Sequence, residues 1–328
     1  MPWETVNTSK GASPYWRRSL PQVPTEFLNS VIYLYHNEED ADTGVATGAS
    51  GCLVAFPSEA DSSRNHIYAI TNAHVIEDGF ATVRVNLTHP SSEMKRTFSA
   101  EFSEPDWMTD PVHDIAVCPL PPGSLGWGAK MQPIRLDRFV TEQQIEKEHI
   151  GPGDDLFYIG RFMDHAGKFE NMPSVRFGNI SMLPNEREPI EDDKLKQRRN
   201  QVGYLVEARS RSGYSGSPAF IYWQHAVSSW PRAFGSADIQ TPFPVHMDMK
   251  IFFLGIDWGH LPEVVPLKDS VTNTRLPQVA EIHAGMMGVV PSWHIRKLLE
   301  DSPRLKEQRF RDDEYHRSRY TGTTGVCE

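Results

Sequence analysis

Residues 211–218 read Arg-Ser-Gly-Tyr-Ser-Gly-Ser-Pro and place Ser215 in a glycine-bearing turn directly before an apolar run. Gly213 has no Cβ and can adopt backbone angles that other residues avoid, so the amides of Gly213 and Ser215 can point at one spot. Two such donors stabilise the negative oxygen of a tetrahedral intermediate by about 3–4 kcal/mol each. The turn therefore predicts a nucleophile at Ser215 and an oxyanion hole at Gly213 and Ser215, with Gly216 leaving room for backbone.

A serine hydroxyl is a weak nucleophile unless a base removes its proton and a third group orients that base. Residues 69–76 read Ala-Ile-Thr-Asn-Ala-His-Val-Ile and place His74 where an apolar strand gives way to a helical turn. Residues 113–117 read His-Asp-Ile-Ala-Val and place Asp114 at the start of another apolar strand. The set predicts serine hydrolysis by His74, Asp114 and Ser215, and we interpret His113 as a surface or turn residue.

Short apolar runs rich in Val, Ile, Tyr and Phe recur along the 328 residues, bounded by Gly, Pro, Asn and Asp. There are roughly six in each half, a pattern typical of sandwiches and barrels. One helix is predicted after Pro291, with Ser292 as its cap and apolar residues at helical spacing. We expect an N-terminal arm (1–27), a first β-barrel (28–135), a connection (136–152), a second β-barrel with this helix (153–301) and a charged, solvated tail (302–328). Residues 225–250 are interpreted as a long insertion.

The composition disfavours several other classes of protein. The chain has 33 Lys and Arg against 43 Asp and Glu, a net charge of −10, which disfavours nonspecific binding to nucleic acid. No apolar run approaches the roughly 18 residues of a membrane helix, and the start of the chain lacks the apolar stretch of a secretory signal. The three cysteines, Cys52, Cys118 and Cys327, do not suit a disulfide framework. We therefore expect a cytoplasmic protein without nucleic-acid or membrane partners.

No metal or cofactor is expected. The chain has 13 histidines, but neither Cys-x-x-Cys nor His-Glu-x-x-His spacing occurs in it. We interpret Cys52 and Cys118 as small core residues. The short basic cluster Lys194, Lys196, Arg198 and Arg199 is interpreted as a solvated face.

Three segments resemble the signatures of the trypsin-like (chymotrypsin-fold) serine proteases, in a form similar to prokaryotic HtrA-type and other trypsin-like peptidases: Thr71–His74, Asp114–Val117 and Gly213–Pro218. Their order, His then Asp then Ser, is that of this fold. Further stretches resemble strands and the ending of the same family: Ala49–Val54, Gly153–Gly160, Gly255–Gly259 and Gly288–Ser292. The resemblance covers about residues 28–300. It implies an all-β fold of two six-stranded antiparallel Greek-key barrels with a short C-terminal helix.

The resemblance also implies a substrate site. Its primary pocket would be lined by Arg209, Ser210 and Arg211 on one side and by Asp257, Trp258, Gly259 and His260 on the other. Substrate would add as an extended strand along Asp257–Gly259. An arginine in the pocket would favour an acidic substrate side chain, whereas Asp257 or Glu207 would neutralise it, and both outcomes stay open.

Two departures from the family bear on activation and domain content. Tyr214 stands where the digestive branch carries an aspartate that receives a new N-terminal amine, so activation by trimming is not expected. Only 28 residues follow Glu300, too few for the PDZ domain that HtrA-type proteins usually append.

The preferred function is a serine endopeptidase acting on a peptide or protein substrate, with a regulatory protein partner as an open candidate. The alternative is a latent or inactive protease-shaped binding or scaffold module. A third hypothesis is an α/β-hydrolase esterase, which would require glycine where Ser217 stands and an acid and histidine downstream, such as Asp257 and His283.

Overall fold

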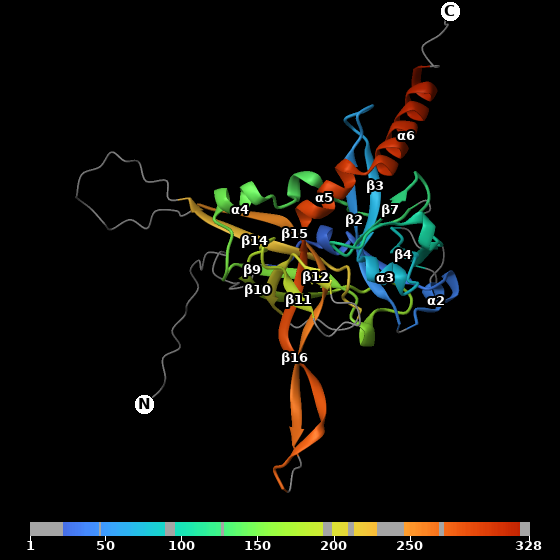
Figure 1. Ribbon diagram of the computed structural model, residues 1–328. Coiled ribbons are helices and arrows are strands. Elements are labelled where there is room, and N and C mark those ends of the chain that lie inside the picture. Colours follow the sequence, from blue (N-terminus) through green and yellow to red (C-terminus); the bar gives the residue numbers. More distant parts are fainter. Residues whose placement is uncertain are drawn as a thin grey trace, which may run out of the picture.

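The computed structural model describes residues 22–45, 47–88, 96–125, 128–192, 199–208, 213–227, 246–268 and 272–321. Strands dominate the described chain, and its two longest helices lie at the C-terminal end (Figure 1). None of the described helices is both long and apolar enough to cross a membrane.

The first half forms one mainly antiparallel sheet with strand order β5-β4-β1-β2-β3-β7-β6, and β8 pairs with β2 in parallel. Its strands are β1 (Val31–Tyr35), β2 (Ala49–Pro57), β3 (Asn65–Thr71), β4 (Thr82–Asn86), β5 (Thr97–Ala100), β6 (Met108–Asp110), β7 (Ile115–Leu120) and β8 (Ile134–Arg135). Its helical segments are α1 (Thr25–Leu28), α2 (Glu38–Thr43), α3 (Ala73–Glu77) and the 3-10 helix η2 (Glu104–Asp106). Every residue of β1 is buried, as expected of an apolar run inside a covered sheet.

The second half forms a closed antiparallel barrel with strand order β10-β13-β16-β15-β14-β9. Its strands are β9 (Asp155–Gly160), β10 (Ser174–Met182), β13 (Tyr204–Glu207), β14 (Pro218–Val227), β15 (His246–Lys268) and β16 (Arg275–Pro291). A separate two-stranded sheet pairs β11 (Ile190–Asp192) with β12 (Arg199–Gln201). The connecting helical segments are η3 (Leu136–Arg138), α4 (Glu142–Glu148) and η4 (Met163–His165).

A closed six-stranded barrel is thus confirmed for one half only, because the first sheet is open between β5 and β6. These two strands are separated by residues 101–107, which include η2, so the chain bends between them. As a result β5 pairs with β4, whereas β6 pairs with β7. The α/β-hydrolase hypothesis is wrong for this fold, since that class requires a mainly parallel sheet and these strands are almost all antiparallel.

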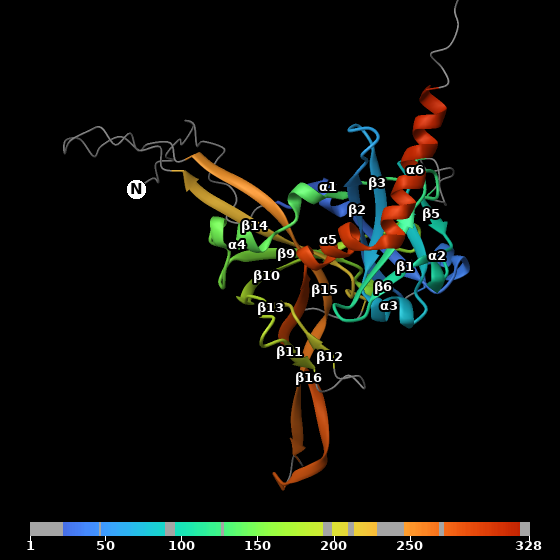
Figure 2. The ribbon, with the colours of Figure 1, turned by 45° about the horizontal axis from the view of Figure 1, so that its top comes forward.

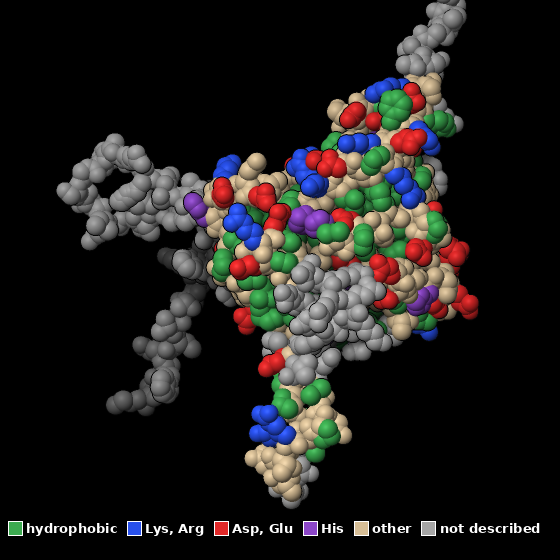
Figure 3. Space-filling model, viewed as in Figure 1, with side chains coloured by type: hydrophobic (Ala, Val, Ile, Leu, Met, Phe, Trp, Pro, Cys, Tyr) green, Lys and Arg blue, Asp and Glu red, His purple; other side chains and the backbone are tan. Residues whose placement is uncertain are grey.

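Two long hairpins extend from the barrel (Figures 1 and 2). In the first, β14 pairs with β15 as far as Val227 and His246, so the two ends of the predicted 225–250 insertion are paired strands. Residues 228–245 lie outside the described residues. The second hairpin, β15 with β16, projects from the body and carries exposed hydrophobic side chains (Figure 3), among them Leu267, Leu276, Val279 and Ile282.

Aromatic side chains in the core join the two halves. Phe27 of α1 lies edge-on to Phe157 of β9 and Phe220 of β14, with ring centroids 5.9 and 4.8 Å apart. Cys52 lies in the same core cluster and Cys118 in that of the first half. Both are buried free thiols, and burial raises the pKa of each, that of Cys118 to about 12. Their interpretation as core residues is confirmed.

The first C-terminal helix is α5 (Ser292–Asp301), which lies where the two halves meet (Figures 1 and 2). The prediction that Ser292 caps this helix is wrong. Ser292 is its first residue, and the hydroxyl donates a hydrogen bond to the carbonyl of Val140 at 2.9 Å. The side chain therefore ties the helix to the segment that leads into the barrel.

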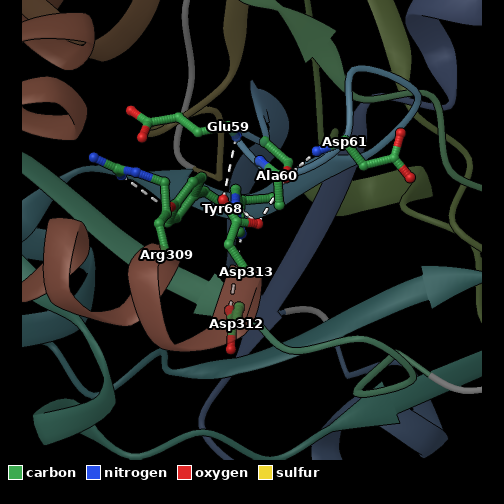
Figure 4. Close-up of polar contacts among 9 residues, drawn as sticks. Glu59, Ala60, Asp61, Tyr68, Arg309, Asp312 and Asp313 are labelled. Carbon is green, nitrogen blue, oxygen red and sulfur yellow. Dashed lines mark hydrogen bonds and ion pairs between the residues drawn. The ribbon is translucent and has the colours of Figure 1, made fainter. Parts of the chain in front are cut away.

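The prediction of a solvated tail is wrong for the next residues, which form α6 (Pro303–Thr321). Leu305 is fully buried in the core cluster. Farther along the helix, Asp313 accepts a hydrogen bond from Ser58 Oγ at 2.6 Å, and Arg309 donates to the hydroxyl of Tyr68 at 3.0 Å (Figure 4). The helix is docked mainly by polar contacts, which is why its charged composition suggested exposure.

Truncation of Leu305 tests whether α6 contributes to stability. We expect Leu305→Ala to lower the free energy of unfolding by about 2–5 kcal/mol, because it removes a buried side chain and leaves a cavity. Phe310 of the same helix is 58% exposed, so Phe310→Ala should cost less than about 0.5 kcal/mol. Urea denaturation followed by tryptophan fluorescence measures both values, and equal costs for the two variants would contradict the docking.

Candidate active site

His74 and Asp114 form a hydrogen-bonded pair at one end of the first sheet. The last residue of β3, Thr71, pairs with Ala116 near the start of β7, so the segments after β3 and before β7 are neighbours. His74 Nδ1 lies 2.8 Å from Asp114 Oδ2, and the backbone amide of His74 donates to Asp114 Oδ1 at 2.9 Å. Asn72 Nδ2 donates to the carbonyl of Asp114 at 3.1 Å. The carboxylate therefore fixes both the ring and the backbone of the histidine.

The burial of the pair defines its chemistry. The side chain of Asp114 is 4% exposed and that of His74 is 32% exposed. A carboxylate at Nδ1 favours the tautomer with the proton on that nitrogen, which leaves Nε2 to accept a proton. The backbone of Asp114 has φ 53°, a left-handed conformation that a non-glycine residue holds only when its surroundings fix it.

The turn around Ser215 has the conformation that its glycines allow. Gly213 has φ 91° and Gly216 has φ 82°, both in the left-handed region. The amide of Ser217 donates to the carbonyl of Tyr214 at 2.8 Å and closes the turn. A Cβ on Gly216 would lie 2.2 Å from the carbonyl oxygen of Ser50 and 2.3 Å from Thr71 Oγ1. The turn therefore packs directly on β2 and on the end of β3 that leads to His74.

Ser50 of β2 makes four hydrogen bonds at this turn through its hydroxyl, amide and carbonyl, and the sequence patterns gave it no role. Its Oγ donates to the carbonyl of Gly213 at 2.7 Å and accepts from the amide of Arg161 at 2.8 Å. Its amide donates to the carbonyl of Ser215 at 3.0 Å, and its carbonyl accepts from Thr71 Oγ1 at 2.8 Å. Ser50 lies within the stretch Ala49–Val54 that resembles a strand of the family, but no spacing rule links position 50 to position 213.

The barrel holds the same turn from its other side. The amide of Gly216 donates to the carbonyl of Asp257 at 2.8 Å, and the amide of Asp257 donates to the carbonyl of Ser217 at 2.9 Å. Tyr214 is fully buried, and its hydroxyl accepts from Arg176 Nε at 2.8 Å and bonds to Ser174 Oγ. The serine turn is therefore attached to both halves of the molecule.

The predicted substrate residues are only partly brought to the site. Asp257 is fully buried and accepts from the amide of Gly259 at 2.8 Å, so its carboxylate does not face the surface. Trp258 is 7% exposed, and its indole lies where a Cβ on Gly288 would come within 1.8 Å. Gly259 is half-buried. His260 is also half-buried, whereas Arg209, Ser210 and Arg211 lie outside the described residues.

A second aspartate–histidine pair lies directly before Asp114. His113 Nδ1 is 2.7 Å from Asp110 Oδ2, and the His113 ring stacks on that of His294 from α5, with centroids 4.0 Å apart. His294 is 7% exposed. Burial, and then the neighbouring His113, lower the pKa of His294 to about 4. His113 is therefore a contact between the two halves, not only a surface turn residue.

In the part of the chain that the structure describes, no three His, Cys, Asp or Glu side chains gather as metal ligands would.

Comparison with known proteins identifies no family for the chain. No sequence profile of a protein family matches it, and no curated protein matches it. Among solved structures, it is similar to the crystal structure of an inactive mutant form of Rv3671c from M. tuberculosis H37Rv. The two chains are 13% identical, with 84% of this chain and 88% of the other covered, at a TM-score of 0.38. A likeness this loose does not transfer a fold or an activity.

Removal of the Ser50 hydroxyl tests its role in holding the serine turn. Ser50→Ala leaves the carbonyl of Gly213 and the amide of Arg161 without that partner in a buried setting. We expect the free energy of unfolding to fall by about 1–3 kcal/mol. The matched control is Ser62→Ala, since Ser62 is exposed, and it should change stability by less than about 0.5 kcal/mol. Chemical denaturation gives both values, and an unchanged stability for Ser50→Ala would refute the role.

The low pKa of His294 predicts how stability depends on pH. The folded state holds this ring neutral down to about pH 4, whereas the unfolded ring takes a proton below about pH 6.5. The unfolded state therefore binds more protons between these values, and stability is lost as pH falls from about 6.5 to about 4, by on the order of 3 kcal/mol. Asp110, His113 and Lys297 also act on this ring.

His294→Phe should flatten that part of the pH profile, because phenylalanine fills the stack without titrating. Urea denaturation at about pH 4.5 and pH 7.5 measures the difference. His36→Gln, a change at an exposed histidine, should keep the wild-type slope. A slope that persists in His294→Phe would mean that another group carries it.

Proposed function

We propose that this protein is a serine endopeptidase of the trypsin-like class, with His74 as general base, Asp114 as its orienting acid and Ser215 as nucleophile. The observation that carries the proposal is the position of the His74–Asp114 pair relative to the serine turn. His74 follows β3, which ends at Thr71, and the serine turn packs on Thr71 and on Ser50, which share a hydrogen bond. Two segments far apart in sequence thus converge on one end of the first sheet.

The strand order supports a two-barrel interpretation of the fold. If β5 and β6 count as one interrupted strand, it is the fifth strand of the first half and β7 is the sixth. Around the sheet, the strands then follow the order 1-2-3-6-5-4. The barrel has the same order, with β9 as its first strand and β16 as its sixth. The same topology in both halves is what a pair of Greek-key barrels requires, and in such a pair the site lies between them.

The chemistry follows from the roles of the three side chains. As Ser215 Oγ attacks the carbonyl carbon of a peptide bond, His74 Nε2 takes its proton, and Asp114 stabilises the resulting imidazolium. The amides of Gly213 and Ser215 stabilise the oxyanion of the tetrahedral intermediate. His74 then returns the proton to the leaving amine as the C–N bond breaks. A water molecule, deprotonated by His74, hydrolyses the acyl ester and restores Ser215.

The substrate would bind as an extended chain along Trp258 and Gly259, because the amide and carbonyl of Asp257 already bind Ser217 and Gly216. Just before this stretch, Ile256 of β15 pairs with Pro218 of β14, and the pairing of these two strands ends there. After Ile256, β15 continues with one edge paired to β16, and its other edge faces away from β16. Substrate backbone that pairs with this second edge would gain affinity without the need for one particular sequence. With Asp257 buried, Trp258 and Gly259 are the described residues that we expect to contact substrate. The preference for an acidic substrate side chain, attributed to an arginine in the pocket, stays a hypothesis.

Tyr214, the residue before the proposed nucleophile, is evidence for the prokaryotic branch of the class. Tyr214 is buried and its hydroxyl is bound by Arg176, so the turn needs no incoming N-terminal amine. Cys52 and Cys118 are free thiols, which suits the reducing cytoplasm that we propose as the compartment.

Labelling by a fluorophosphonate probe tests the nucleophile, because the probe reacts only with an activated serine. We expect labelling of the wild-type protein at Ser215 and none of Ser215→Ala. His74→Ala should lower kcat on a casein or peptide substrate by about 10⁶, and Asp114→Asn by about 10⁴. Ser62→Ala, at an exposed serine, should label normally.

Two results would count against the endopeptidase. Proteolysis retained by clean Ser215→Ala protein would remove the assignment of the nucleophile. A folded wild-type protein that never labels would favour the scaffold alternative, in which the fold binds partners without an active site.

A further inference from the structure

The turn that carries Asp114 is held by side chains from several elements. Asp110 Oδ1 accepts from the amides of Val112 and His113 at 3.0 and 3.3 Å, while its Oδ2 binds His113 Nδ1. One carboxylate thus closes the backbone of the turn and orients the His113 ring. Because Asp114 follows His113 directly, any movement of His113 displaces the carboxylate that binds His74.

The second half of the molecule fixes His113 at two points. Its ring stacks on that of His294 at 4.0 Å with an interplanar angle of 22°. Its carbonyl accepts from Gln201 Nε2 at 2.7 Å, and Gln201, the last residue of β12, is 1% exposed. A ring contact and a buried hydrogen bond, from two different elements, therefore converge on the residue before Asp114.

The junction of α5 and α6 supports β6, the strand that leads into this turn. Ser302 Oγ donates to the sulfur of Met108 at 2.9 Å, and Arg304 Nη2 donates to the carbonyl of Pro105 at 2.8 Å. Met108 begins β6, which ends at Asp110. The C-terminal segment thus braces both β6 and the turn that follows it.

We infer that His113 and His294 are positioning residues for the proposed triad, so that helix α5 sets the place of Asp114 and, through it, of His74. The inference rests on the proposed function. Asp114 holds a left-handed backbone at φ 53°, which persists only while its neighbours fix it. Asn72 and His74 fix it from one side, and His113 fixes it from the other. A shift of about 1 Å in such a group costs about 100-fold in rate.

The stack of His113 on His294 requires an aromatic ring at position 294, but it does not require a charge on that ring. Among the described residues, His294 Nε2 has no hydrogen-bond partner, so its ring serves as a buried aromatic surface. Asp110 already binds Nδ1 of His113, so the His113 ring needs only an aromatic face from position 294. A neutral aromatic side chain at 294 should therefore preserve the position of His113, whereas alanine should not.

The test compares His294→Ala with His294→Phe and with Arg296→Ala. Arg296 lies on the same helix and pairs only with Glu300 on the surface in the described structure. We expect His294→Ala to slow fluorophosphonate labelling of Ser215 by about 10- to 100-fold. It should also weaken the low-field proton NMR signal of His74 Nδ1–H, which reports the bond to Asp114. The labelling rate of His294→Phe should stay within about threefold of the wild-type rate, and that of Arg296→Ala should equal the wild-type rate.

A second variant keeps the test valid if His294→Ala does not fold. Gln201→Met removes the donor to the His113 carbonyl at similar volume, and it should also slow labelling and weaken the His74 signal. Because both changes act through His113, the double variant should lose less than the product of the two single losses. A folded His294→Ala or Gln201→Met protein with wild-type labelling and an unchanged His74 signal would overturn the inference.

The NMR signal separates this inference from the proposed function. A wild-type protein that does not label would contradict the proposed function. In that case the His74 signal still decides the inference, since it reports the His74–Asp114 bond without any turnover. Loss of the signal in His294→Ala but not in His294→Phe supports the positioning role, and its retention in both refutes it.

Discussion

Ser50 makes the contact on which the relation between the two halves depends. It belongs to β2 of the first sheet, yet its hydroxyl donates to Gly213 and accepts from Arg161, both of the second half. A single hydroxyl can do both at once. In a fully buried position, any of these groups left unpaired would cost the full penalty of desolvation. The serine turn therefore has one low-energy position, and that position is next to the strand end that carries His74.

Two buried arginines reinforce this junction. Arg161 donates to the carbonyls of Thr47 and Val45 from its guanidinium, which lies 4.4 Å from the ring centroid of Tyr35. The guanidinium of Arg84 lies 4.9 Å from the same ring and donates to the carbonyl of Gly167 in the second half at 2.9 Å. Burial lowers the pKa of both arginines, but a guanidinium stays charged in proteins. Since a buried charge is tolerated only while its hydrogen bonds persist, the two side chains penalise any sliding of one half against the other.

Local patterns predicted local features well. The strand end at His74, the turn before β7 and the glycines around Ser215 each need only a few adjacent residues, and short apolar runs predicted most strands. Contacts between distant segments were not predictable, because nothing near Ser50 in the sequence specifies Gly213, which lies 163 residues away. The charged composition of α6 was misleading for a related reason. A helix docked by Asp313 and Arg309 looks solvated until its partners are known, which are Ser58 just after β2 and Tyr68 of β3.

The gap in the first sheet and the C-terminal helices are best understood together. An open edge leaves backbone amides and carbonyls of β5 and β6 without strand partners, and proteins commonly cover such edges with a helix. Here the break between the strands contains Pro105, whose carbonyl is bound by Arg304, and β6 begins at Met108, whose sulfur is bound by Ser302. The junction of α5 and α6 therefore stabilises the sheet where hydrogen-bonded closure is missing. Because β6 leads directly to Asp114, the same contacts that complete the sheet also support the acid of the candidate active site.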